Sequence, residues 1–360
     1  MRPAAPLTCR LARADELERV AAFARRAAGV DIPLPCWRWK YFDNPAGAAG
    51  IAIALDGEQI VGLMSAFAVP FRLDGRQLLA SKMEHNDVLR SHRSAGAYFQ
   101  LATTVFQELV DRRGIDFCLG FAIQETRDLS TVMMGFEEVG PVAKLVKILN
   151  PVPHLRRKVK LPLPRSLGTL AAVGKRREAR RALGDLTASR FEHFSEVDDP
   201  VWKDANPGRL FASREPSYLE WRYAKCPQPR YERVQLRSGR DLIGFLVYHT
   251  FEEKGVRYGV LDECFGLRPD GVWPLVDLAI GELLEQDVDA IVAWAPPSTE
   301  LHRSLKDHGF VSRPAPRSLI VRQLSDRVPA VVLTSEDSWY YTVGDAEYWL
   351  FPVAEGWSAE

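Results

Sequence analysis

The sequence lacks the features that would assign it at once to a membrane or secreted class. It has no uninterrupted apolar run of membrane-spanning length, because Asp56 and Glu58 break the longest candidate, residues 51–71. The first residues also lack the apolar core of a signal peptide. We therefore expect a soluble, globular protein without a transmembrane segment.

Cysteine is scarce and is not arranged in pairs. The five cysteines are odd in number, are scattered and include no C-x-x-C spacing: Cys9, Cys36, Cys118, Cys226 and Cys264. This pattern argues against a disulfide framework and against a zinc site. We expect no metal ion and a reducing cytoplasmic location.

An excess of charge of one sign is also missing. Forty-seven basic residues balance forty-seven acidic residues, so the overall charge predicts no nucleic-acid partner. The exception is local, since residues 154–181 carry ten lysines and arginines against one acidic residue, Glu178. Two interpretations stay open for this segment: a solvated linker with a surface helix, or contact with an anionic lipid head group or polymer. The oligomeric state is not predicted.

What the sequence does contain is an ordered set of helices and strands. A length of 360 residues with 46% hydrophobic content suffices for two well-packed domains. The apolar patterns of the first half predict a helix, three strands of antiparallel type, a helix, a strand, a helix and a strand. These elements cover residues 14–28, 51–55, 59–68, 77–87, 97–112, 116–122, 129–134 and 143–149.

The stretch 84–101 predicts a strand, a glycine-bearing turn and a helix. Its turn, Arg93-Ser94-Ala95-Gly96, precedes a well-specified amphipathic helix. Backbone N–H groups at a helix start attract anions, Arg93 adds positive charge, and Gly96 lets a phosphate approach the backbone. The turn is therefore a candidate pyrophosphate site.

This element order and turn resemble the GNAT acyltransferase superfamily. Its cofactor signature is Arg or Gln, two residues, Gly, one residue, then Gly or Ala; Tyr98 stands here at the last position. Gly135-Phe136 also matches the usual end of the family's last helix, whereas Thr131 replaces a tyrosine often used as general acid, so that role is unassigned. The resemblance implies an acyl-CoA cofactor, most simply acetyl-CoA. The residues it places beside the cofactor are Val88, Arg90, Arg93, Ser94, Ala95, Gly96, Ala97 and Tyr98.

An internal repeat extends the same plan to the second half. At an offset of 182, Trp39-Lys40-Tyr41 aligns with Trp221-Arg222-Tyr223, and Val61-Gly62 aligns with Ile243-Gly244. The second turn has no Arg-two-residues-Gly match and carries Asp270 where an anion would bind, so we expect no cofactor there. The predicted fold is α/β (α+β), with two GNAT-like units in tandem, each a mixed, mostly antiparallel sheet flanked by helices. The expected divisions are an acyl-CoA-binding domain (1–150), a basic linker (151–190), a degenerate domain (191–325) and an aromatic, acidic tail (326–360).

Amine acylation requires a group that removes a proton from the attacking nitrogen. Glu84 is the predicted base and His85 is the alternative, because strand alternation should send the two side chains to opposite faces. We expect partial dehydration to raise the pKa of Glu84 toward neutrality. Four residues of the second half are candidate acceptor-binding groups: Asp262, Glu263, Trp339 and Asp345.

The sequence thus predicts an acyl-CoA-dependent N-acyltransferase that acts on a small or saccharide amine. Two alternatives remain. A Fem-type aminoacyl transferase is also a tandem protein, although the retained Arg93 and Gly96 and the zero net charge argue against it. In the other alternative both units bind a ligand or partner without catalysis.

Overall fold

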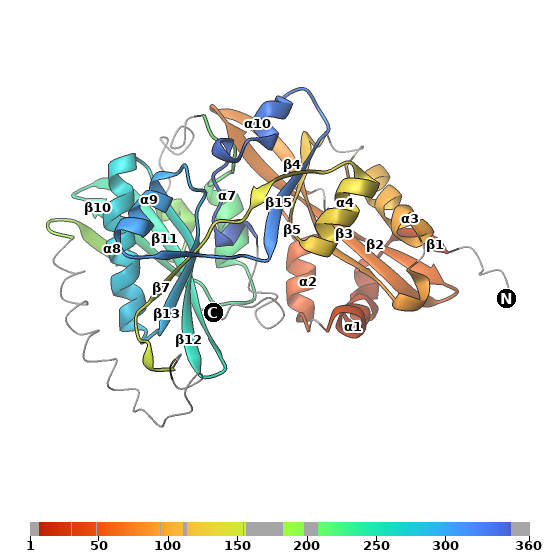
Figure 1. The fold of residues 1–360 in the computed structure, drawn as a ribbon, viewed down its shortest axis with the longest axis horizontal. Helices are drawn as coiled ribbons and strands as arrows, with labels where there is room; N and C mark the ends of the chain where they lie inside the picture. Colours follow the sequence, from red (N-terminus) through yellow and green to blue (C-terminus); the bar gives the residue numbers. More distant parts are fainter. Residues whose placement is uncertain are drawn as a thin grey trace. The chain divides into compact units, whose positions relative to one another are not determined.

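The structure is a computed structural model, and it describes residues 7–29, 31–47, 49–93, 95–110, 114–153, 155, 183–197 and 208–346. The chain divides into two compact units (Figure 1). Unit 1 comprises Met1–Gly140, Lys225–Gln228 and Arg317–Ser335, and unit 2 comprises Pro141–Ala224, Pro229–Pro316 and Glu336–Glu360. Most of the expected basic linker (151–190), including residues 156–182, lies outside the described residues. Among the described helices, none is long and apolar enough to cross a membrane.

Unit 1 is built on a mixed sheet with strand order β1-β2-β3-β4-β5-β15-β6. Its strands are β1 (Thr8–Leu11), β2 (Ala49–Asp56), β3 (Gln59–Leu73), β4 (Arg76–Val88), β5 (Phe117–Ile123), β6 (Glu137–Pro141) and β15 (Arg317–Gln323). Its longer helices are α1 (Leu17–Ala28), α2 (Leu34–Tyr41), α3 (Ala95–Val105), which continues as a π-helical turn (Phe106–Val110), α4 (Gln124–Met134) and α10 (Ala330–Thr334). Short 3₁₀ turns cover Ala14–Glu16 and Arg90–His92.

Helix α3 packs closely on the middle of this sheet because two glycines make room for it. A Cβ atom on Gly62 of β3 would lie 2.9 Å from Leu101, and one on Gly50 of β2 would lie 3.1 Å from Leu109. The hairpin between β2 and β3 turns at Gly57, whose φ of 59° is the left-handed conformation that glycine adopts without strain. Glycine thus fixes both the turn and the helix position that the site requires.

Unit 2 is built on a second mixed sheet, with order β14-β7-β13-β12-β11-β10-β8. Its strands are β7 (Lys144–Ile148), β8 (Thr187–Arg190), β10 (Glu232–Ser238), β11 (Asp241–Glu253), β12 (Val256–Gly266), β13 (Ala290–Trp294) and β14 (Val311–Arg313). A short strand, β9 (Phe211–Ala212), lies in the same part of the chain but is not a member of this sheet. Its helices are α7 (Pro216–Leu219), α8 (Pro269–Glu285) and α9 (Glu300–Asp307). A π-helical turn covers Glu220–Ala224, and 3₁₀ turns cover Phe194–Val197, Glu336–Ser338 and Val343–Asp345.

The two units have the same internal plan, which confirms the predicted repeat. In both, a β-hairpin with a left-handed glycine at φ 59°, Gly57 or Gly239, leads to a long strand and then a helix. Gly244 stands under α8 as Gly62 stands under α3, since a Cβ on Gly244 would lie 2.6 Å from Leu275. Both units are therefore mixed, mostly antiparallel sheets flanked by helices, as expected.

The last strand of each unit comes from an unexpected part of the chain. Residues 143–149 do form a strand, β7, but it pairs with β13 of unit 2. The matching place beside β5 in unit 1 is taken by β15, in the register Phe121↔Leu319. The division at residue 150 and the single span 191–325 therefore do not follow the compact units: strand β7 belongs to unit 2, and residues 317–335 belong to unit 1.

A buried aspartate anchors each exchanged strand. Asp116, just before β5, accepts a hydrogen bond from the backbone N–H of Leu79 (2.9 Å), and its own C=O accepts from the N–H of Leu324, directly after β15 (3.0 Å). Asp289, just before β13, is 1% exposed. Its carboxylate accepts a hydrogen bond from the backbone N–H of Arg257 (2.9 Å), and its C=O accepts from the N–H of Leu149, directly after β7 (2.8 Å). These bonds fix the end of each exchanged strand against the sheet it completes.

The exchange predicts that a fragment ending at Leu149 will not fold stably. It would lack β15, which leaves the buried strand β5 with an unpaired edge, and it would carry β7 without its partner β13. We expect circular dichroism to show no cooperative thermal transition for residues 1–149. Joining residues 1–140 through a short Gly/Ser linker to residues 317–335 should restore the transition, and a well-folded 1–149 fragment would contradict this.

Candidate active site

Strands β4 and β5 of unit 1 separate just where the predicted catalytic residues lie. They are parallel neighbours, but within the described residues their ladder extends only over Ala80–Lys82 and Phe117–Leu119. Beyond Lys82, β4 continues to Val88 paired with β3 on its other side, while β5 continues to Ile123 paired with β15. The inner edge of β4 thus turns backbone groups toward an opening between two parallel strands, where an extended ligand could bind as a further strand does.

A β-bulge at this opening changes how the two candidate bases point. Leu63 pairs with Asp87 and Ser65 pairs with Glu84, so His85 and Asn86 together lie opposite one residue of β3. His85 has a φ of 50°, a left-handed conformation that costs free energy in a residue other than glycine. The expected strict alternation is therefore wrong, because the bulge brings Glu84 and His85 both against helix α2.

Glu84 lies between two buried lysines. Its Oε2 accepts a hydrogen bond from Nζ of Lys40 on α2 (2.6 Å), and its Oε1 lies 3.1 Å from Nζ of Lys82 on β4. The side chains of both lysines are 4% exposed, and that of Glu84 is 12% exposed. Burial alone would raise the pKa of Glu84, but the two ammonium groups hold it well below its usual range. The expected rise toward neutrality is therefore wrong, and Glu84 is a carboxylate at neutral pH.

His85 is the group in this cluster that is neutral at physiological pH. Its ring packs on Trp37 of α2, with ring centroids 4.8 Å apart. Burial lowers the pKa of His85 to about 4, an effect that Glu84 opposes and Lys40 reinforces. An uncharged imidazole can accept a proton, so the electrostatics favour His85 over Glu84 as the base.

The predicted pyrophosphate turn runs into α3, so Ala95 and Gly96 form the first residues of the helix. The first N–H groups of a helix have no partners within it. Gly96 is exposed, and Ala97 is buried against the sheet. Arg93 stays close to the turn, because its Nε donates to the backbone C=O of Val88 (3.1 Å). Ser94 and the side chain of Ala95 lie outside the described residues.

Three other residues that were predicted to bind the cofactor differ in how exposed their side chains are. Tyr98 is 6% exposed, and its hydroxyl donates to the sulfur of Met134 (3.1 Å), so its ring is part of the core between α3 and α4. Val88 ends β4 and also packs on this core. Arg90 begins the exposed 3₁₀ turn that joins β4 to the phosphate turn. Tyr98 could therefore serve a cofactor only through its backbone N–H, whereas Arg90 keeps a side chain in solvent.

In unit 2, the position equivalent to Glu84 is occupied by Glu263. Glu84 stands opposite Ser65, three residues after Gly62, and Glu263 stands opposite Val247, three residues after Gly244. Glu263 is paired with Arg214, whose Nη2 lies 2.7 Å from Oε2. Burial raises the pKa of Glu263 to about 7, and the Arg214 guanidinium opposes this rise.

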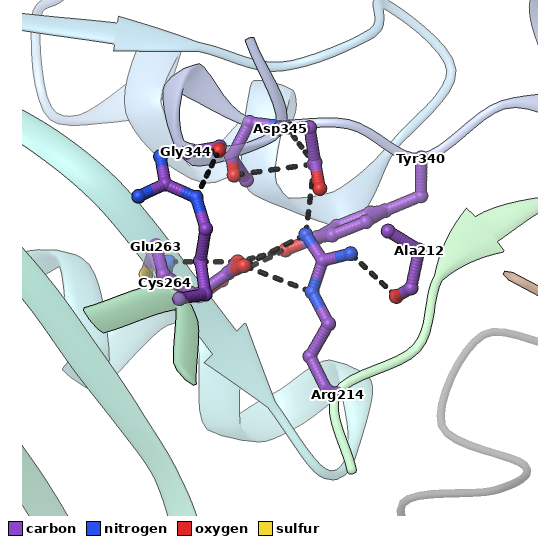
Figure 2. Close-up of polar contacts among 9 residues, drawn as sticks. Ala212, Arg214, Glu263, Cys264, Tyr340, Gly344 and Asp345 are labelled. Carbon is purple, nitrogen blue, oxygen red and sulfur yellow. Dashed lines mark hydrogen bonds and ion pairs between the residues drawn. The ribbon is translucent and has the colours of Figure 1, made fainter. Parts of the chain in front are cut away.

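The chain's own C-terminal segment covers this second position (Figure 2). The Tyr340 hydroxyl donates to the C=O of Cys264 (3.0 Å), and Asp345 is paired with Nη2 of Arg214 (2.9 Å). Gly344 approaches so closely that a Cβ there would lie 2.7 Å from the backbone oxygen of Asp262. Residues 340–345, which we call the C-terminal plug, thus occupy in unit 2 the region that corresponds to the opening in unit 1.

The four predicted acceptor-binding residues therefore lie inside unit 2. Trp339, Asp262 and Glu263 are each 1% exposed. Asp262 pairs with Nδ1 of His249 (2.6 Å), and Asp345 caps the last 3₁₀ turn by accepting from the N–H of Thr342 (2.8 Å). Their contacts stabilise unit 2 and its plug, and this burial does not favour a role in acceptor binding.

Helix α8 of unit 2 begins with an acidic residue, as the sequence indicates. Asp270 lies in the first turn of α8, where its charge complements the positive end of the helix. A pocket there is lined by residues that include Asp270, Arg268 and Ile243, and a Cβ on Gly271 would lie 2.8 Å from Ile243. A phosphate would meet a carboxylate at this turn, which supports the expectation that unit 2 binds no cofactor.

Sequence reasoning missed the residues that surround Glu84. In the sequence, Lys40 stands out only as part of the repeated Trp-Lys-Tyr segment, and Lys82 belongs to no motif. Lys82 precedes Glu84 by two positions on the same strand, so alternation could have placed both side chains on one face. The pairing with Lys40 has no such signal, because it joins residues 44 positions apart.

Comparison with solved structures shows that this architecture is similar to the fold of GCN5-related N-acetyltransferases. An Anabaena variabilis GCN5-related N-acetyltransferase superposes with a TM-score of 0.61 at 8% identity over 89% of this chain and 73% of that chain. A probable N-acyltransferase from Enterococcus faecalis gives 0.57 at 11% identity over 89% and 72%. Saccharomyces cerevisiae N-myristoyltransferase with bound myristoyl-CoA gives 0.54 at 13% identity over 89% and 79%.

The sequence itself matches no protein-family model and no curated protein. The likeness is therefore one of fold. Because the matches span most of the chain and the two units share one plan, we conclude that the chain has the GNAT fold in two tandem units.

Replacing Glu84 by Gln is expected to destabilise the protein by about 3–5 kcal/mol, because two buried ammonium groups would lose their common counter-charge. Chemical denaturation measures this directly. Glu138→Gln is the matched control, since Glu138 pairs with Arg127 at the surface and should contribute less than about 1 kcal/mol. Adding Lys40→Met to Glu84→Gln should recover part of the loss. A Glu84→Gln protein as stable as the parent would refute the pairing.

Proposed function

We propose that unit 1 binds an acyl-CoA and transfers its acyl group to an amine. The observation that carries this proposal is the separation of β4 from β5 directly before the phosphate turn, in a chain with the GNAT fold. In this arrangement the pyrophosphate binds the N–H groups at the start of α3, with Arg93 and Arg90 nearby. The pantetheine arm runs along the open edge of β4 between Glu84 and Val88. The acyl chain is acetyl or longer; a structural neighbour holds myristoyl-CoA, and that fact belongs to the neighbour.

The reaction joins the amine nitrogen to the thioester carbonyl carbon and then breaks the C–S bond. The nitrogen must lose a proton as the new bond forms, and the departing sulfur leaves as a thiolate that takes up a proton. We assign the acceptance of the nitrogen's proton to His85, directly or through a water. Glu84 stays ionised beside it and stabilises the imidazolium that results.

The proposed location and acceptor rest on the cysteines and on the amino-acid sequence. The five cysteines are all thiols, which supports a reducing compartment such as the cytoplasm. The acceptor is proposed to be a small amine, including an amino sugar, as the sequence suggests. The C-terminal plug supports a structural rather than a catalytic role for unit 2.

One CoA should bind per chain, at the turn that contains Gly96. Isothermal titration calorimetry with CoA is expected to give a stoichiometry near one. Gly96→Asp should weaken binding at least 100-fold, because its carboxylate would repel the pyrophosphate at the helix start. The control is Asp270→Asn at the equivalent turn of unit 2, which should leave CoA affinity unchanged. Two equivalent sites, or full affinity in Gly96→Asp, would count against the proposed site.

The assignment of the base predicts an unusually acidic pH limit. With a pKa of about 4, His85 remains neutral until the pH falls through about 4, so kcat/KM should decline there rather than near 6.5. His85→Asn should lower kcat by about 10²–10⁴-fold and remove that limb, with CoA affinity retained. Stopped-flow or thiol-release assays across pH 3.5–8 measure both. An unchanged profile in His85→Asn would place the base elsewhere.

A further inference from the structure

The cluster around Glu84 contains two buried ammonium groups but only one carboxylate to accept their hydrogen bonds. Lys82 and Lys40 both direct their ammonium groups at Glu84, which supplies one negative charge. Within the described residues, Nζ of Lys82 is completely buried and has no acceptor that meets hydrogen-bond geometry; its one close contact is the 3.1 Å ion pair. Burying an ammonium group that lacks acceptors costs free energy. This cost would be offset if an acceptor joins the cluster when a ligand binds.

The surroundings of Lys82 suit a ligand that is flat, apolar in part and anionic. Nζ of Lys82 lies 5.3 Å from the centroid of the Phe67 ring, and Nζ of Lys40 lies 5.5 Å from the same ring. Tyr41 packs edge-on against Phe67, with centroids 6.3 Å apart. An aromatic wall beside two cations excludes water, which strengthens an ionic contact made there.

The position of Lys82 places this group at the proposed reaction site. Lys82 is the last residue of β4 that pairs with β5, and it lies on the same strand face as Glu84. That face packs against α2, whereas α3 packs through Leu101 on the opposite face with Met64 and Met83. The ammonium therefore lies on the side of the sheet away from the phosphate turn, which is the side left for the acceptor.

We propose that Lys82 binds a carboxylate of the acceptor, so that the substrate is an amine that also carries a carboxylic acid. This inference rests on the proposed function. A single carboxylate would give the Lys82 ammonium the hydrogen-bond acceptor that the described residues do not supply, and it would balance the second positive charge of the cluster. A phosphate dianion would add two negative charges beside the ionised Glu84, one more than the two ammonium groups of Lys40 and Lys82 balance. Lys82 selects the substrate, and His85 accepts its proton.

The first test measures anion binding without any catalysis. The full-length protein is titrated calorimetrically with benzoate and with benzamide, which have the same shape and differ in charge. Benzoate is expected to bind and benzamide to bind at least 10-fold more weakly. Lys82→Met should lose this preference, whereas Lys144→Met, which replaces a buried lysine of unit 2, should keep it. Equal binding of the two probes, no binding of benzoate, or an unchanged preference in Lys82→Met would each overturn the proposal.

The second test uses two acceptors that differ only by a carboxylate, benzylamine and 4-(aminomethyl)benzoate, with acetyl-CoA as donor. The parent protein should favour the carboxylate-bearing amine in kcat/KM, and Lys82→Met should reduce that ratio at least 10-fold, mainly through KM. A fall in kcat that is equal for both amines would mean that Lys82 acts on the thioester oxygen, and this would overturn the proposal. Lys82→Arg, which keeps the charge, guards against a folding defect and should retain part of the ratio.

The two tests also separate this inference from the proposed function. If CoA fails to bind while benzoate binding still depends on Lys82, the acyltransferase proposal fails and the anion site stands. If CoA binds and amines are acylated without any carboxylate preference, the anion site fails and the acyltransferase proposal stands.

Discussion

The feature on which the rest of the structure depends is the exchange of one strand between the two halves of the chain. Strand β15 holds β5 from its outer side, and Asp116 anchors the end of that pairing. The ladder between β4 and β5 ends at Lys82 and Leu119. Because β15 still pairs with β5 beyond this point, only one edge of β5 loses its partner there. The opening at the candidate site is therefore supported by residues that are almost 200 positions away in the sequence.

Much of each unit could be predicted because the signals are local. Asp56-Gly57 between alternating apolar residues specifies the hairpin of β2 and β3, and the repeat of Val61-Gly62 at Ile243-Gly244 reveals the second copy. The exchange could not be predicted in this way. Residues 143–149 and 317–323 both have the pattern of a short apolar strand, and nothing in either says which sheet it completes. Partner choice depends on contacts between distant residues.

The candidate site could also be predicted only where its signals are local. Gly96 and Arg93 were found because a phosphate turn is a contiguous motif, and Glu84 and His85 because they precede it on one strand. The electrostatics were predicted with the wrong sign, since a lone strand carboxylate gives no hint of Lys40 on another helix. The bulge at His85 was missed as well, because an added residue in a ladder is visible only against the partner strand. In unit 2 the residues chosen for aromatic and acidic character are buried and make contacts within unit 2 and its plug.

The strand exchange also has a consequence for the order in which the protein is made. When a ribosome has produced β5, the strand that will cover its edge is still about 200 residues away in the message, and at about 5–20 residues per second it appears some 10–40 s later. During that interval unit 1 presents an apolar, unpaired strand edge, which other nascent chains could join. The sheet of unit 1 therefore cannot be completed until β15 has been synthesised, so this unit finishes folding only after most of unit 2 has been made.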